Sequence, residues 1–316
     1  MKLIQLLMLL LLNSNILGQA YTSYTTTVPS TIDSYQQPLV VIDSPGKALV
    51  VSGHSWGGSN DNYNDPIGLA NKFNRYPANH IIAEYRGPNA TPDSAGSRKA
   101  RRDIMDARDW GMDNLDIDGP ILFNGVSGAG HAGLMVASEY DRAFDFYQIT
   151  VPVVDIIAWY KQMDKPNIIT SPAILNVAPQ LQAYIRNVCG GDPLVNGPAK
   201  RTCKRRSPIH NIGPHIKAQI DWHVGIADQV IPATQSLRGF NKLVGEEVFS
   251  KRVIKYVLKN KDLPNRMKLD NPLYCTNSEV VIYKKRIGNK RIIVHTGGHG
   301  GCFGSGFENY TFKSWS

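Results

Sequence analysis

The sequence has 316 residues, 42% of them hydrophobic, which is enough for one large domain with a full core, and it shows no internal repeat. Its formal net charge of +9 raises the question of an anionic partner. The basic residues gather only at 98–102 and 200–206, where neither interleaved aromatics nor a nucleic-acid-binding motif accompanies them. We therefore expect a solvated basic surface and no nucleic-acid partner.

The N-terminal stretch has the composition of a secretory signal. Lys2 precedes an apolar run over residues 3–12, and small residues at Gly18 and Ala20 suit cleavage before Tyr21. The run is too short to span a bilayer, and no later stretch reaches that length. Residues 1–20 are therefore expected to be a signal peptide, and the remaining chain to be exported and soluble, without a membrane anchor.

The rest of the chain alternates between strand and helix patterns. Residues 21–37 are rich in Thr, Ser and Tyr without either periodicity, which predicts an extended leader before a single domain over 38–316. Strands are expected at 39–42, 48–51, 80–84, 121–123, 146–154 and 216–224, with a turn joining the first two. Helices are expected at 67–76, 97–112, 174–188, 232–244 and 248–260, and a final hairpin at 279–283 and 291–294. This alternation predicts an α/β fold with a mostly parallel central sheet flanked by helices.

Four cysteines in a chain expected to be exported predict two disulfides. Three connectivities are possible, and proximity favours Cys189–Cys203, which would close a surface loop over 189–208, together with Cys275–Cys302. Their spacing does not resemble a zinc site, and no Cys-His cluster accompanies them, so neither a metal nor a cofactor is expected.

A nucleophile is suggested where a short strand ends in the run Gly125-Val126-Ser127-Gly128-Ala129-Gly130 and a helical pattern follows. A serine at a sharp turn between strand and helix needs small neighbours, because the two elements approach closely there. The pattern departs from G-x-S-x-G, since Ala129 occupies the fifth position and the glycine follows at 130. An ordinary glycine-rich turn is the alternative interpretation.

A serine nucleophile needs a base and a carboxylate that orients the base. Asp228 follows one expected strand and His299 follows a later one, inside Thr296-Gly297-Gly298-His299-Gly300-Gly301, which gives the order Ser, Asp, His. Asp228 could instead cap the helix expected near Pro232. His295 competes for the base role, but it directly follows the strand, where a buried structural histidine is more common. His131 and His223 are interpreted as structural.

Acyl transfer also requires hydrogen-bond donors for the oxyanion. The backbone N–H of Gly128, directly after the serine, is one candidate. The 53–59 loop, which contains Trp56 and Gly57, can supply the other through backbone N–H groups or the Trp56 indole. The sequence does not choose between them.

These residues resemble the catalytic domain of the prolyl oligopeptidase family. The matching segments are Tyr85-Arg86-Gly87, 103–110, the turn at 125–130 (the elbow), 152–155, 207–209, 227–232 with 235–236, and 298–300. The resemblance implies an α/β-hydrolase fold in which Ser127, Asp228 and His299 are nucleophile, acid and base. Some members place an oxyanion-binding Tyr where this chain has Trp56, and the chain has no room for the β-propeller that restricts many members to small peptides.

The C-terminal part is similar to polyhydroxybutyrate-depolymerase and feruloyl-esterase-type hydrolases. In those proteins a Cys-containing segment and a strand pair precede a Gly-Gly-His loop, as 274–276, 280–283 and His299 do here. Both resemblances imply the same triad and differ in substrate, so a small ester or a peptide is expected. A hydrolase-fold binding protein without turnover is the alternative from another class.

Overall fold

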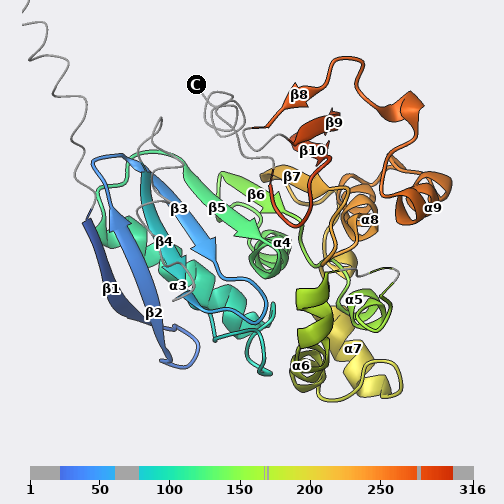
Figure 1. Ribbon diagram of the computed structural model, residues 1–316. Helices are drawn as coiled ribbons and strands as arrows, with labels where there is room; N and C mark the ends of the chain where they lie inside the picture. The colour runs from blue at the N-terminus through green and yellow to red at the C-terminus, as the bar shows by residue number, and fades with distance from the viewer. Residues whose placement is uncertain (1–21, 61–77, 167, 169–170, 276–278, 302–316) are drawn as a thin grey trace, which may run out of the picture.

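The computed structural model describes residues 22–60, 78–166, 168, 171–275 and 279–301. Ten strands form one sheet in the order β1-β2-β4-β3-β5-β6-β7-β10-β9-β8 (Figure 1). The strands are β1 (Thr22–Pro29), β2 (Gln36–Asp43), β3 (Ala48–Gly53), β4 (Ala78–Ala83), β5 (Ile121–Val126), β6 (Phe146–Thr150), β7 (Gln219–Gly225), β8 (Leu273–Tyr274), β9 (Val280–Ile287) and β10 (Lys290–His295).

The centre of the sheet is parallel and its two margins are antiparallel. β4, β3, β5, β6, β7 and β10 pair in parallel, whereas β1, β2, β9 and β8 join by antiparallel ladders. Every residue of β4, β6 and β10 is buried. Strands covered on both faces need not alternate between apolar and polar residues, and the sequence marks β4 and β10 by their short apolar segments 81–83 and 292–294.

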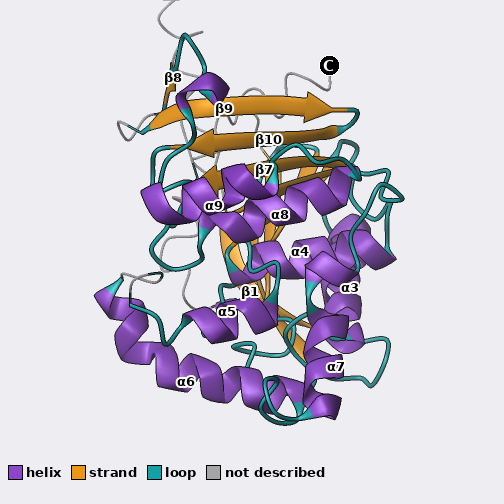
Figure 2. Cartoon of the chain, turned by 90° about the vertical axis from the view of Figure 1, so that its right-hand side faces the viewer, coloured by secondary structure: helices purple, strands orange, loops and turns teal. Residues whose placement is uncertain are grey.

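Helices α3 (Arg98–Asn114), α4 (Gly128–Glu139) and α8 (Ala233–Val244) lie along the sheet and contact its central strands (Figure 2). α9 (Lys251–Asn260) packs on α8. The start of α3 is fixed by Ser97, whose hydroxyl accepts a hydrogen bond from the N–H of Ala100. The prediction of a mostly parallel sheet flanked by helices is confirmed.

A second group of helices stands apart from those on the sheet. α5 (Ile156–Gln162), α6 (Pro172–Cys189) and α7 (Gly197–Arg206) contact one another and lie together in the lower part of Figure 1. Their apolar cluster also contains Trp56 and Ile231, which belong to loops after β3 and β7. This group therefore packs against loops at the carboxyl ends of the central strands.

Two of the expected elements need correction. The segment 189–208 is not only a loop, because α7 occupies it: Asn196 caps the helix, and Ala199 and Cys203 are buried one turn apart. The two strands expected on either side of 44–46 are present as β2 and β3, and each of them pairs with β4. The strand expected over 146–154 ends at Thr150. The helix expected over 67–76 lies outside the described residues.

Most of the segment expected to be an extended leader contributes to the sheet. Thr22–Pro29 forms β1, which pairs along its whole length with β2, and β2 begins at Gln36. The turn that follows β1 is anchored by Arg86, whose guanidinium forms ion pairs with Asp33 and with the buried Asp103 of α3. Most of β1 is exposed, so it has no apolar alternation by which the sequence could reveal it.

Candidate active site

Ser127 occupies a strained turn between β5 and α4. Its φ is 59° and its ψ is −115°, in a region that residues other than glycine rarely adopt, and it directly precedes the first residue of α4. Such backbone strain costs on the order of 1–3 kcal/mol and persists only where the surroundings enforce it. The Ser127 N–H donates to the carbonyl of Thr150 at 2.9 Å, which ties the turn to the end of β6.

The structure shows why the residue after Ser127 must be small. A side chain at Gly128 would overlap the backbone of Ser55 and Trp56, because the loop after β3 passes directly over the start of α4. Ala129, which stands where the G-x-S-x-G pattern has glycine, is almost fully buried. The close approach is therefore made at Gly128, one residue nearer to the serine.

The predicted acid and base lie on loops at the same edge of the sheet. The last pairs of the parallel ladders align Val126 with Thr150 and Thr150 with His223, and they align Gly225 with His295. The carboxyl ends of β5, β6, β7 and β10 are therefore neighbours. Because adjacent strands are about 4.8 Å apart, loops leaving these ends are within reach of one another.

Asp228 and His299 are joined by a hydrogen bond. His299 Nδ1 lies 2.9 Å from Asp228 Oδ2, across 71 positions of sequence. The Asp228 side chain is 1% exposed, whereas that of His299 is 24% exposed. A buried carboxylate thus faces one ring nitrogen of a partly accessible histidine, which is the arrangement that orients a catalytic base.

The alternative role of Asp228 as a helix cap is not the one that the structure shows. α8 begins at Ala233, and its cap residue is Pro232, which makes no side-chain capping hydrogen bond. Instead, Asp228 Oδ1 accepts from the N–H groups of Val230 and Ile231 at 2.7 and 2.9 Å. The carboxylate therefore uses one oxygen to shape its own loop and the other to hold His299.

The three candidate oxyanion donors have different surroundings. The backbone nitrogen of Trp56 lies over Gly128, so these two peptide groups are adjacent. The Trp56 indole packs against Trp159 and His131, with ring centroids 5.5 and 5.4 Å away. The N–H of Gly57 donates to the carbonyl of Pro88 at 2.9 Å, so it is already engaged in a backbone hydrogen bond.

Solved structures of other proteins share this architecture. The chain superposes on a prolyl endopeptidase with a TM-score of 0.54 and 12% identity over 92% of its length. It superposes on oligopeptidase B of Leishmania major with a TM-score of 0.56 and 14% identity, again over 92%. An esterase of Pyrococcus furiosus gives a TM-score of 0.53 and 10% identity over 93%.

The chain has the α/β-hydrolase fold. It spans 38% and 34% of the two peptidases and 89% of the esterase. Neither a family model nor a curated protein sequence matches it. The named structural neighbours, two peptidases and an esterase, share this fold with the chain.

His80, His131 and His223 of this α/β-hydrolase fold are buried. His131 Nε2 lies 2.7 Å from the carbonyl of Arg206, and burial lowers the pKa of His131 to about 4. Burial also lowers the pKa of His223 to about 3 and that of His80 to about 4. These side chains are neutral at pH 7 and lie inside the protein, in agreement with a structural role for His131 and His223.

Of the two expected disulfides, the structure describes Cys189–Cys203, which links the end of α6 to α7. Cys275 is also disulfide-bonded, while its expected partner, Cys302, lies outside the described residues. Within the described ranges, no helix is long and apolar enough to cross a membrane, and no group of three or more His, Cys, Asp or Glu could hold a metal ion.

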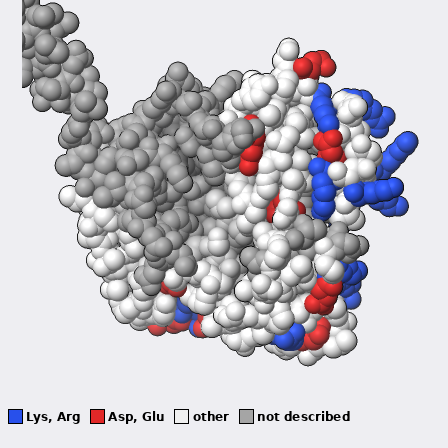
Figure 3. Space-filling model, in the orientation of Figure 1, with Lys and Arg blue, Asp and Glu red and all other residues white. Residues whose placement is uncertain are grey.

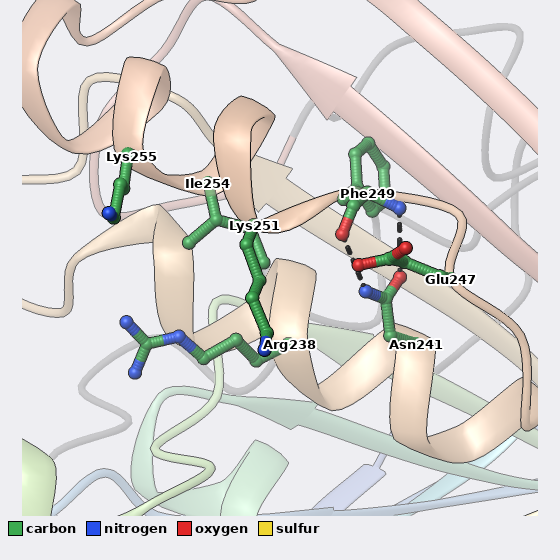
Figure 4. A pocket seen from close by; sticks show the side chains of 7 residues that line it. All are labelled: Arg238, Asn241, Glu247, Phe249, Lys251, Ile254 and Lys255. Carbon is green, nitrogen blue, oxygen red and sulfur yellow. Dashed lines mark hydrogen bonds between the residues drawn. The ribbon is translucent and has the colours of Figure 1, made fainter.

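The basic surface is partly neutralised. Lys99, Arg101 and Arg102 of the 98–102 cluster all form ion pairs with carboxylates. Lys and Arg side chains gather on the side of the molecule where α9 lies (Figures 1 and 3). A groove of about 380 Å³ between α8 and α9 is lined by Arg238, Asn241, Glu247, Phe249, Lys251, Ile254 and Lys255 (Figure 4). Its lining contains no Ser, Cys or His, so the groove has charged groups but no counterpart of Ser127 or His299.

One contact near the site was not anticipated from the sequence. His295 is fully buried, and its Nδ1 lies 2.8 Å from Oε2 of Glu279. Glu279 was placed only as the first residue of a strand. The β9–β10 hairpin shifts register between Val294 and His295. That irregularity is not visible in the sequence, so the sequence does not place Glu279 beside His295.

Proposed function

We propose that this protein is a secreted serine hydrolase that cleaves an ester or peptide bond through an acyl-enzyme on Ser127. The observation that carries the proposal is the 2.9 Å hydrogen bond between Asp228 and His299, on loops at the sheet edge where Ser127 forms a strained elbow. Structural neighbours that include peptidases and an esterase support the reaction class. The apolar N-terminal stretch and the disulfides support secretion.

In the proposed acylation step, the Ser127 hydroxyl attacks the substrate carbonyl carbon while Nε2 of His299 takes the hydroxyl proton. Asp228 holds the other ring nitrogen and stabilises the imidazolium that forms. The backbone N–H groups of Gly128 and Trp56 would donate to the oxyanion, since they are adjacent and the Gly57 N–H is engaged elsewhere.

Collapse of the tetrahedral intermediate breaks the bond to the leaving group, which takes the proton from His299. A water molecule then attacks the acyl carbonyl, with His299 again as the base, and releases the carboxylic acid and free Ser127. No cofactor enters this scheme, because Ser127 and the attacking water supply the electron pairs and His299 carries each proton between them and the leaving group.

A fluorophosphonate probe tests the proposal, because it labels only a serine whose hydroxyl is activated. We expect labelling at Ser127 in the wild-type protein and none in Ser127→Ala. The substitution retains the Cβ atom, and the Ser127 side chain makes no capping hydrogen bond, so the melting curve should be preserved. Wild-type turnover by Ser127→Ala would place the nucleophile elsewhere, and a collapsed melting curve would make Ser127 structural.

The second candidate is a carboxylesterase of the polyhydroxybutyrate-depolymerase or feruloyl-esterase type. It is favoured by the superposition on an esterase over 89% of that protein, against about a third of each peptidase. Short and long acyl esters assayed beside peptide amides separate the two. A wild-type protein that turns over neither and takes no label would instead be a hydrolase-fold binding protein.

A further inference from the structure

The loop that carries His299 lies against a second buried pair of titratable side chains. His295 ends β10 with its side chain completely buried, and its Nδ1 is 2.8 Å from Glu279 Oε2. After the register shift, His295 pairs with Val281, so the same register places Glu279 opposite Gly297. Glu279 therefore stands beside the first turn of the His299 loop.

Gly297 is held by contacts on several sides. A side chain at this position would occupy the space of the Glu279 carboxyl group, so the carboxyl lies directly against the Gly297 backbone. The Gly297 N–H points to Nδ1 of His295 at 3.2 Å, and the Gly297 carbonyl accepts from the N–H of Ala227 at 3.1 Å. Gly297 thus links the base loop, two residues before His299, to the residue before Asp228.

Nδ1 of His295 faces one hydrogen-bond acceptor, the Glu279 carboxylate, and one donor, the Gly297 N–H. A protonated Nδ1 donates to the Glu279 carboxylate, whereas a deprotonated Nδ1 accepts from the Gly297 N–H, so the two bonds belong to different proton positions. The charged and titratable groups that act on His295 are Glu279, Asp228 and His223. Burial lowers the pKa of His295, and the Glu279 carboxylate opposes that shift.

We propose that Glu279, through His295 and Gly297, is a positioning residue that sets the place of the His299 loop relative to Asp228. The inference rests on the proposed hydrolase function. Glu279 contacts neither Asp228 nor His299 in the described hydrogen bonds and ion pairs, so its role is to hold the loop and not to transfer a proton.

The test compares Glu279→Ala with Glu279→Gln. The alanine variant removes the carboxyl group that supports Gly297, while glutamine keeps the shape and an oxygen that can accept from His295. Because a shift of about 1 Å in a catalytic group can cost about 100-fold, we expect kcat of Glu279→Ala to fall by about 10- to 100-fold with KM little changed. Glu279→Gln should restore most of kcat. Glu247→Ala, on the exposed α8–α9 connection, is the matched control and should behave as the wild type.

Activity on an activated ester is normalised to the folded fraction, and the rate of fluorophosphonate labelling at Ser127 is measured in parallel. Suppose that the probe labels Ser127 and that Glu279→Ala has the same kcat and the same labelling rate as the wild type. That result would overturn the positioning role of Glu279 and leave the proposed function standing. Absence of labelling in the wild type would overturn the proposed function and this inference with it. If Glu279→Ala does not fold, Glu279→Asp provides the comparison: it keeps the charge but falls short of His295, so its kcat should also drop, and unchanged kcat would refute the proposal.

Discussion

Asp228→Asn is the most informative substitution at the candidate site, because the structure dictates how the new amide must lie. Asp228 Oδ1 accepts two backbone N–H groups, from Val230 and Ile231, while Oδ2 faces His299 Nδ1. If the asparagine NH₂ faced the two N–H groups, both hydrogen bonds would be lost, at about 1 kcal/mol each or more. The amide oxygen therefore replaces Oδ1, and the NH₂ group must face His299.

That orientation places the imidazole proton on the wrong nitrogen. An NH₂ group donates to Nδ1, so the ring proton moves to Nε2, the atom that must accept the proton of Ser127. Removal of the acid's charge with this change of tautomer costs about 10⁴-fold in kcat in serine proteases, or about 5.5 kcal/mol of transition-state stabilisation. Stability should fall by only about 1 kcal/mol, since the hydrogen bonds are kept but lose their charge.

The assay is kcat/KM on an activated ester, together with a urea unfolding curve of the same preparation. Asp270→Asn, at an exposed position after α9, is the control for loss of one carboxylate and should match the wild type in both measurements. A folded Asp228→Asn protein that retained activity within about 10-fold of the wild type would show that Asp228 is not the acid, and the reasoning from the loop geometry would fail.

Three further predictions follow from the same structure. His299→Ala should lose about three or more orders of magnitude in turnover. His295→Ala should lose much less turnover, and it should melt at a lower temperature because the His295 side chain is buried. The reverse result would exchange the roles of the two histidines. Reduction opens both Cys189–Cys203 and the disulfide of Cys275, and should lower the free energy of unfolding in denaturation with and without reductant. The loop of about 15 residues closed by Cys189–Cys203 accounts for up to about 3 kcal/mol of this loss, and an unchanged curve would contradict the prediction. Burial lowers the pKa of His131 to about 4, below the value near 6.5 of the unfolded chain, so the free energy of unfolding should fall as the pH drops from about 6.5 to 4. His131→Gln should remove its share of this dependence in pH-resolved melts, while the shares of His80 and His223 remain; an unchanged dependence would contradict this.

The sequence alone located the elbow at Ser127 and the loops that carry Asp228 and His299. It did so because each is a local pattern: a buried apolar strand followed by small or flexible residues. The central strands are largely buried, and short apolar segments such as 121–123 of β5 and 292–294 of β10 make them recognisable. The mostly parallel sheet could be predicted for the same reason.

Other features depended on which segments meet in space. β1 is an exposed margin strand with no apolar alternation, so nothing in its composition distinguished it from a leader. The strands β2 and β3 follow each other in sequence, yet β4 separates them in the sheet, because pairing is decided by the whole sheet and not by chain order. The α7 helix was hidden by the Gly, Pro and basic residues around Cys203.

The chemistry of the site was likewise completed only by tertiary structure. The bond between Asp228 and His299 spans 71 positions and depends on the parallel pairing of β7 and β10. The Gly57 N–H looked as available as that of Trp56 until the fold paired it with Pro88. The sequence determines which residue types are able to do chemistry. Strand register and the close approach of two loops decide which of their atoms come together and which are already engaged in other hydrogen bonds.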